Sequence, residues 1–354
     1  MNNKKRRNMN NFKKIGLTAL AGSLAAVSAN AIELSVTGET TVSYVNNTAD
    51  KTSAIGGQGI GTSTGIYFNG SGELENGWTV TSFSALEDGA ATSLSSSQLN
   101  LTMGSMGTVT FAQAGGTTAN GIDDVTPKVA EEAWDQGYSV LQSFGSSTNS
   151  GAIAYKSAPV DVEGFTFSFG LDYDPAAGAA GADHDAPATK AMGVGSGTAM
   201  VVKLTSPLGI TLGAGRELVN GQPNHSDKEN LTAYALYSMG PVSVGYQGYY
   251  LDNGSTDGVT QANGSAADYS GAAYSVAFNV NDDLSIGYQV VDETQEAQSG
   301  TLAADREITS ITAAYSTGGM TVSVQQTDTD NRGFAVAGSE INVENLQVTL
   351  SFAF

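Results

Sequence analysis

Cysteine is absent from this chain of 354 residues, and histidine, charged residues and long apolar runs are scarce. The absence of cysteine excludes disulfide bridges and thiolate metal sites, and it leaves the redox compartment open. Charged residues make up only 14% of the chain and are unbalanced, with 35 Asp and Glu against 15 Lys and Arg. The resulting net charge of −20 argues against a nucleic-acid partner, because phosphates would be repelled.

The N-terminus carries the only sustained apolar run. Six Lys and Arg precede this run, which extends from Ile15 to about Val27 and is followed by the small-x-small sequence Ala29-Asn30-Ala31. This arrangement is typical of a secretory signal peptide, and the run is too short to favour the alternative of a membrane anchor. We therefore expect cleavage of residues 1–31, leaving a mature chain of residues 32–354 with nine basic residues and a net charge of −26.

Alternation of apolar and polar residues is the pattern that recurs in the mature chain. In the final nine residues every second side chain is apolar, from Leu346 to Phe354. A period of two indicates a β-strand with one apolar and one polar face. About sixteen such stretches are expected: 36–44, 65–74, 78–86, 97–103, 108–114, 152–157, 165–173, 198–205, 210–218, 231–239, 242–251, 269–280, 284–291, 308–316, 320–327 and 344–354.

The connections between these strands alternate between short and long. The short ones are turns of two to five residues, whereas the long ones are polar and rich in Gly, Asp and Ser. A soluble β-sandwich would need a second apolar face to form a dry core, and these second faces are Thr, Ser, Gln, Asn, Gly and carboxylates. The pattern therefore predicts an all-β, transmembrane antiparallel β-barrel of about 16 strands, with an apolar outside and a polar inside.

The signal peptide, the sixteen alternating strands, the terminal Phe354 and a longest loop over Gly115–Ser150 resemble the general porins of Gram-negative outer membranes. The resemblance covers the whole mature chain and is architectural. It implies a homotrimer of separate pores in the outer membrane, surrounded by its lipids. It also implies that the third extracellular loop folds inward to narrow the pore, and that Phe354 is the assembly signal read by the barrel-assembly machinery.

The long loop contains a predicted short helix. Thr126 would be the N-cap, Pro127 the first helical residue and Gly137 the stop signal. Folded into the pore, the loop would bring a carboxylate cluster to its narrowest part and favour cations over anions. The alternative is a loop on the outer surface whose acids are merely solvated. The predicted constriction acids are Asp123, Asp124, Glu131, Glu132 and Asp135.

The barrel wall opposite the loop lacks the basic cluster that many general porins have. Inward positions of the first four strands offer Glu39, Glu73 and several uncharged polar residues, but no Lys or Arg. Lys156 and Lys203 are the candidate wall cations, in phase with the polar face, with ordinary solvation in the lumen as the alternative. Arg216 is in phase with the apolar face, so we expect it at the rim.

Motifs for catalysis or metal binding are weak. The two histidines, His184 and His225, lie in long loops without a nucleophile pattern, so we expect no enzymatic activity, no cofactor and no dedicated metal site. Adventitious Ca²⁺ on the acidic loops is the one metal contact expected, without assignable residues.

We therefore expect a porin through which water, ions and small hydrophilic solutes diffuse passively, with a preference for cations. A substrate-selective channel of the same fold is one alternative. An outer-membrane lipase or protease and a plugged adhesive barrel are alternatives from other classes.

Overall fold

The computed structural model describes residues 33–51, 56–87, 94–137, 144–177, 194–221, 227–254, 267–297, 303–335 and 338–354. The expected signal peptide (residues 1–31), His184 and His225 lie outside the described residues. Within the described ranges, one antiparallel sheet of 17 strands makes up almost all of the regular structure. No helix in this part of the chain is long and apolar enough to cross a membrane.

The strands follow one another closely in sequence. The first eight are β1 (Glu33–Ala49), β2 (Gly57–Glu73), β3 (Thr79–Glu87), β4 (Leu94–Thr102), β5 (Thr108–Ala114), β6 (Ala152–Lys156), β7 (Val160–Val162) and β8 (Phe165–Asp174). The next nine are β9 (Val194–Thr205), β10 (Ile210–Gly221), β11 (Lys228–Met239), β12 (Val242–Asp252), β13 (Ala267–Asn279), β14 (Leu284–Ala297), β15 (Ala303–Thr317), β16 (Met320–Asp330) and β17 (Val343–Ala353). Three short helices complete the list: η1 (Gly104–Met106), η2 (Asn120–Ile122) and α2 (Ala133–Gly137).

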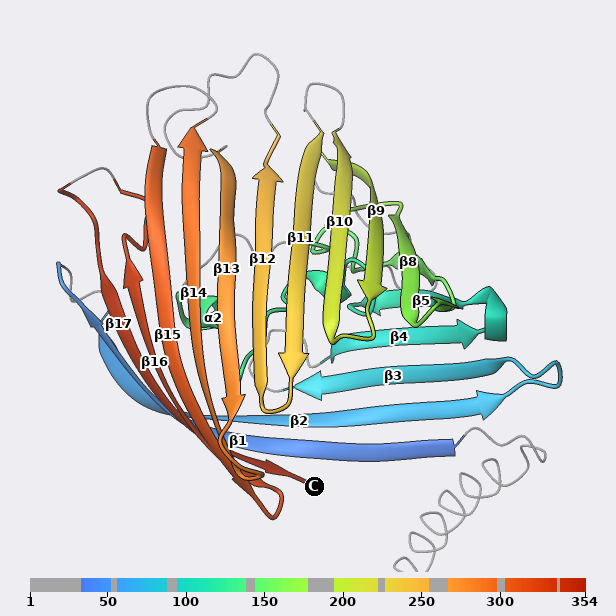
Figure 1. Cartoon of the computed structure of the whole chain (residues 1–354), viewed down its shortest axis with the longest axis horizontal. Helices are drawn as coiled ribbons and strands as arrows, with labels where there is room; N and C mark the ends of the chain where they lie inside the picture. Colours follow the sequence, from blue (N-terminus) through green and yellow to red (C-terminus); the bar gives the residue numbers. More distant parts are fainter. Residues whose placement is uncertain are drawn as a thin grey trace, which may run out of the picture.

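The sheet closes into a barrel because β1 pairs with both β2 and β17. The C-terminus consequently lies beside the first strand (Figure 1). β6 and β7 both pair with β8 and are separated only by residues 157–159, so they are two parts of one barrel strand. Pro159 lies in this break, and proline has no N–H with which to continue a ladder. The described strands thus form a closed, 16-stranded antiparallel barrel, which confirms the predicted fold class.

The two faces of the wall have the predicted polarity. On β8, Phe165, Phe167 and Phe169 point outward and are between 38% and 44% exposed. Asp172 and Asp174, in the opposite phase, are buried inside. Since the lumen holds polar groups, the apolar surface has no dry core to enter and remains on the outside, as a lipid environment requires.

The strands are longer than the alternation of apolar residues indicated. β14 continues to Ala297, and β15 already begins at Ala303. Both strands thus extend into a stretch that the sequence predicted as loop. The pattern fades there because both faces become polar near the ends, while the backbone ladder continues. The connection between the predicted strands 152–157 and 165–173 is likewise shorter than expected, since only Glu163 and Gly164 form the turn. Both have a positive φ, as a tight hairpin turn of this kind requires.

Candidate functional site

The loop between β5 and β6 lies inside the barrel, where inward-facing side chains bind its backbone. Its described parts are residues 115–137 and 144–151. The side chains that hold it are at most 4% exposed and come from five alternate strands: Asp172 of β8, Glu217 of β10, Gln247 of β12, Gln289 of β14 and Gln325 of β16. The inward position that the sequence predicted for this loop agrees with these contacts.

Three glutamines bind one side of the loop. A primary amide offers both a donor and an acceptor, and Gln247 and Gln289 each use both on loop backbone groups that would otherwise be buried without partners. The contacts are Val125 N to Gln247 Oε1 (2.9 Å), Gln247 Nε2 to Ile122 O (2.8 Å), Ala133 N to Gln289 Oε1 (2.8 Å), Gln289 Nε2 to Pro127 O (3.3 Å) and Gln325 Nε2 to Glu131 O (3.3 Å).

Two buried carboxylates bind the two ends of the loop. Each accepts backbone N–H groups, which are the partners that a buried carboxylate needs. Asp172 accepts from Thr118 N (3.1 Å) and Ala119 N (2.6 Å), and Glu217 accepts from Gly145 N (3.1 Å) and Ser147 N (3.1 Å). The loop is therefore fixed at its start, along its middle and near its end.

Apolar contacts add to these hydrogen bonds. Trp134 of α2 is 4% exposed and packs with Tyr249, Val291 and Ile308 of the wall. A second cluster joins loop residues Ala119, Ile122 and Phe144 to wall residues Ala199, Val201 and Tyr234. The loop thus covers two apolar patches of the inner wall.

The helix in the loop differs from the prediction. It is the short α2, which begins at Ala133, not at Pro127, and Gly137 is its last residue, not the residue after it. Thr126 is buried, and its hydroxyl has no hydrogen-bond partner within the described structure, so it is not an N-cap. The reason is tertiary: Gln247 and Gln289 take backbone groups of Val125 and Pro127 for their own hydrogen bonds.

The five predicted constriction acids differ in exposure. Glu131 and Asp135 are exposed, Asp123 and Asp124 are half-buried, and Glu132 is buried. Burial raises the pKa of Asp124 to about 6, and the negative charge of Asp123 adds to the shift. Burial also raises the pKa of Asp123, Glu131 and Glu132. Glu131, Glu132 and Asp135 are close together, with carboxylate oxygens within 4.8 Å of one another.

Lys128 is a cation within this acidic group that sequence reasoning overlooked. Its ammonium forms an ion pair with Glu132, four residues further on. Burial opposes the charged form, but the hydrogen bond and charge of Glu132 outweigh it and raise the pKa of Lys128. The cluster is therefore partly compensated, and Glu131 and Asp135 are its exposed members.

Glu39 lies on the inner face of β1, on a wall that does not bind the loop. It is exposed and accepts a hydrogen bond from Tyr67 Oη at 2.7 Å. Its charge contributes to the raised pKa of Glu131, after burial and the charge of Asp135. The loop acids and the β1 wall therefore influence one another electrostatically.

The predicted wall cations lie on the faces that the alternation indicated. Lys156 and Lys203 are exposed on the inner face, paired in register with Gly170 and Gly213. Arg216 lies on the outer face, where its Nε is 2.5 Å from Glu229 Oε1.

Arg306 is an inner-wall cation that the sequence did not reveal, because its stretch was predicted as loop. It is 4% exposed, forms an ion pair with the equally buried Glu293, and donates to the carbonyl of Arg332 at 2.9 Å. The ring of Phe334 covers its guanidinium, 4.1 Å from centroid to Cζ. Glu293 thus pairs with the buried charge, and the contacts of Arg306 join β14, β15 and the loop after β16.

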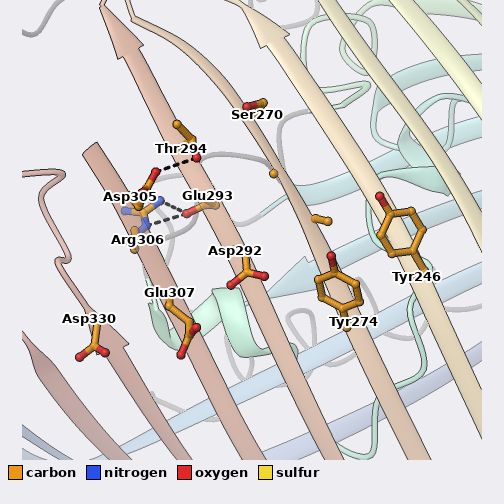
Figure 2. A pocket seen from close by; sticks show the side chains of 12 residues that line it. Tyr246, Ser270, Tyr274, Asp292, Glu293, Thr294, Asp305, Arg306, Glu307 and Asp330 are labelled. Carbon is orange, nitrogen blue, oxygen red and sulfur yellow. Dashed lines mark hydrogen bonds and ion pairs between the residues drawn. The ribbon is translucent and has the colours of Figure 1, made fainter. Parts of the chain in front are cut away.

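A second acidic group faces outward at the ends of β14–β16 (Figure 2). The strand register places Asp292 opposite Glu307, and Glu307 opposite Asp330, so three carboxylates form a row across three strands. Tyr246 and Tyr274 lie on the same face, toward the middle of the barrel (Figure 2). This row contains none of the predicted constriction acids and lies on the opposite face of the wall from the loop.

The five buried anchors of the loop were the main omission of the sequence analysis. A signal for them exists, since each polar anchor interrupts an inward series of small residues on every second strand. Gln247, Gln289 and Gln325 were assigned only to a generally polar lumen. Their individual role depends on contact with a loop more than 100 residues away in sequence.

The comparison with solved structures shows porin-like barrels. Porin OmpF of Salmonella typhi, in complex with daunomycin, has a TM-score of 0.66 at 15% identity, covering 91% of this chain and 98% of its own. The anion-selective porin of Comamonas acidovorans has a TM-score of 0.64 at 14% identity, covering 91% and 100%. OmpT, an outer membrane protein of Vibrio cholerae, has a TM-score of 0.62 at 12% identity, covering 93% and 99%.

Sequence comparisons give the family. No curated protein sequence matches this chain. The sequence profile of the Gram-negative porins matches residues 16–256, more than half of the chain. Together with the closed 16-stranded barrel and its inward-folded loop, this match shows that the chain belongs to the Gram-negative porin family.

Proposed function

We propose that the protein is a cation-preferring diffusion pore of the outer membrane, open to water, ions and small hydrophilic solutes. The observation that carries the proposal is the position of the acidic loop. It is docked on β8–β16 and presents Glu131 and Asp135 to the lumen. Carboxylates held in a narrow passage with low-dielectric walls attract cations and repel anions.

The wall cations do not reverse this preference. Lys128 is paired with Glu132, and Arg306 is paired with Glu293. Lys156 and Lys203 are exposed on the inner face, and we propose that they supply the opposing side of a weak transverse field. The solved relatives include an anion-selective porin, so the fold alone does not set the sign of selectivity.

The test is the single-channel conductance of the refolded mature protein in planar bilayers, with the reversal potential measured under a KCl gradient. We expect large ohmic steps and a potential that indicates K⁺ preference. Neutralising Asp123, Asp124, Glu131, Glu132 and Asp135 together should weaken this preference. A variant with only two of these substitutions, Glu131→Gln/Asp135→Asn, should already weaken the cation preference in part.

The matched control is Asp282→Asn/Asp283→Asn, which removes the same charge from a short turn between β13 and β14. This control should leave the reversal potential unchanged, because the turn lies at the end of the barrel, outside the section that the loop narrows. Equal effects of the two double variants would contradict a role of the loop as the selectivity element. An absence of conductance would favour a plugged adhesive barrel.

The assembly of this pore follows the same reasoning. We propose export with cleavage after residue 31, insertion through the barrel-assembly machinery and a homotrimer in the outer membrane. An OmpT of Vibrio cholerae is described in a trimer form, which supports the trimer. We propose no enzymatic activity and no resident cofactor.

A further inference from the structure

Four inward-facing glycines lie directly under the loop. A Cβ atom at any of them would lie within 2.8 Å of a loop side chain, which is closer than real Cβ contacts occur. Each glycine belongs to a strand that also supplies one of the five buried anchors. The pairs are Gly170 with Thr118 Oγ1 (2.4 Å), Gly215 with Phe144 Cζ (2.4 Å), Gly245 with Pro127 Cδ (2.4 Å) and Gly287 with Val129 Cγ2 (2.8 Å).

Each glycine is followed two residues later by the polar anchor of its strand. The pairs are Gly170 and Asp172, Gly215 and Glu217, Gly245 and Gln247, and Gly287 and Gln289. Residues two apart in a strand share one face, so both members of each pair point into the barrel. On β16, Ser323 takes the place of glycine before Gln325 and is itself buried. Five alternate strands, which run in the same direction, thus repeat one small-x-polar pattern.

The two members of the pattern act on the loop in different ways. The glycine lets a loop side chain approach the backbone of the wall, a typical use of glycine within a strand. The polar residue then reaches the loop backbone at hydrogen-bond distance, as Gln247 reaches Val125 N at 2.9 Å and Ile122 O at 2.8 Å. A side chain at Gly245 would displace Pro127 and stretch both of these contacts.

We propose that this repeated small-x-polar pattern is a docking track that sets the distance between the loop and the wall, and thereby the cross-section of the pore. The wall is a continuous hydrogen-bonded sheet and the loop is not, so the loop moves when a side chain is added between them. The only free space is toward the lumen. The proposal rests on the proposed function only in taking the loop as the boundary of the pore.

The docked position is tested by a disulfide, which needs no transport measurement. A Cβ at position 287 would lie 3.3 Å from Val129 Cβ, close to the spacing of about 3.5–4.5 Å in disulfides. Because the chain has no native cysteine, Val129→Cys/Gly287→Cys contains a single possible pair. We expect nearly complete cross-linking of the refolded full-length mature protein under mild oxidation, measured by thiol labelling and mass spectrometry.

The control pair is Val129→Cys/Gly59→Cys. Gly59 is a glycine of β2, and no atom lies within 4 Å of its Cβ position. We therefore expect this cysteine pair to form no disulfide. Equal cross-linking of both pairs, or no cross-linking between residues 129 and 287, would contradict the proposed docking track.

The effect on the pore is tested by exchanging the two side chains. Gly287→Val should push the loop into the lumen and lower the single-channel conductance by about two-fold or more. Val129→Gly/Gly287→Val, which places the same volume on the wall instead of the loop, should return the conductance toward the original value. Unchanged conductance in the single variant, or no recovery in the exchange, would contradict the proposal.

The two measurements separate this inference from the proposed function. A disulfide between residues 129 and 287 in a protein without conductance would support the docking track and contradict the proposed pore. Normal conductance without the disulfide would support the pore and contradict the docking track.

Discussion

Asp124 links the chemistry of the loop to pH. Its carboxyl is half-buried among other acids, and burial raises its pKa to about 6. The charged form therefore dominates at pH 7.5, and the neutral form dominates below the raised pKa. Because only the charged form attracts cations, the contribution of Asp124 to selectivity is present above this pKa and is lost as the pH falls through it.

We expect the cation preference of the pore to decline between pH 7.5 and pH 5, as measured by reversal potentials in the same salt gradient. Asp124 is one of five acids in the loop, so we expect part of the preference to remain. Asp124→Asn should start from a lower preference at pH 7.5 and show a flatter profile. Identical pH profiles for the two proteins would show that another group titrates.

The same raised pKa has a consequence for stability with a definite sign. A carboxyl whose pKa is higher in the folded state favours folding in its protonated form, so its burial opposes folding at neutral pH. The hydrogen bond with Glu132 and the charge of Lys128 reduce this cost without removing it. The position of Asp124 is thus not explained by stability, and we propose that its charge in the lumen explains it.

The acids of the loop could be identified from the sequence, whereas their anchors could not. A carboxylate cluster in one long loop is visible by inspection, and the family resemblance indicates where that loop lies. Gln289 gives a weaker signal, because the small residues before it are visible in the sequence but glutamine on a polar strand face usually contacts water. Its function arises from the backbone of Pro127 and Ala133, and those contacts exist only after the barrel has closed.

At the scale of elements, the alternation of apolar residues predicted the strands and missed their ends. β15 begins at Ala303, five residues before the predicted start at residue 308. The additional residues of β15 carry charges on both faces of the sheet, with Arg306 inside and Glu307 outside. Strand formation there depends on pairing with β14 and β16, which a single stretch of sequence does not reveal.

The outward row of Asp292, Glu307 and Asp330 across β14–β16 should oppose strand pairing. Like charges directly opposite one another in an antiparallel sheet are destabilising, by a few tenths of a kcal/mol up to about 1 kcal/mol. We expect Glu307→Gln, at the centre of the row, to raise the free energy of unfolding at low salt. The measurement is urea unfolding of the protein in lipid vesicles, with the gain decreasing at high salt.

A matched control for this substitution is Glu229→Gln. Glu229 also lies on the outer face, but its charge faces a cation and not other carboxylates, because Arg216 is its ion-pair partner. Its replacement should leave the stability unchanged or lower it slightly, as for other exposed ion pairs. Stabilisation by both substitutions would mean that the overall acidity of the rim matters and the row does not.

At the scale of the whole molecule, Phe354 extends the pairing of β1 with β17 that closes the barrel. Phe354 N donates to Gly38 O at 2.9 Å, and Gly38 N donates to Phe354 O at 2.7 Å. The phenyl ring lies over Gly38 on the outer face, where a Cβ would be 2.6 Å from it. Phe354 therefore combines a backbone contact of the closure with an exposed aromatic group.

Two variants separate these roles. Phe354→Ala keeps the backbone, so we expect normal refolding in detergent but reduced assembly in cells, if the ring is the assembly signal. Deletion of Phe354 removes both closing hydrogen bonds and should lower the folded fraction in both settings. The measurement is the heat-dependent mobility of the barrel in gel electrophoresis. Full assembly of the Phe354→Ala variant in cells would contradict the hypothesis that the ring of Phe354 is the assembly signal.

We expect the loop to dock late during folding, because its anchors lie far along the chain. The loop, which begins at residue 115, binds side chains that lie between 53 and 194 residues further along the chain. Contacts of such sequence separation form late, since the intervening chain must first be ordered. The wall from β8 to β16 thus exists before the loop has anything to bind. A newly closed barrel would be at its widest, and narrowing of the passage would be the last step of its maturation.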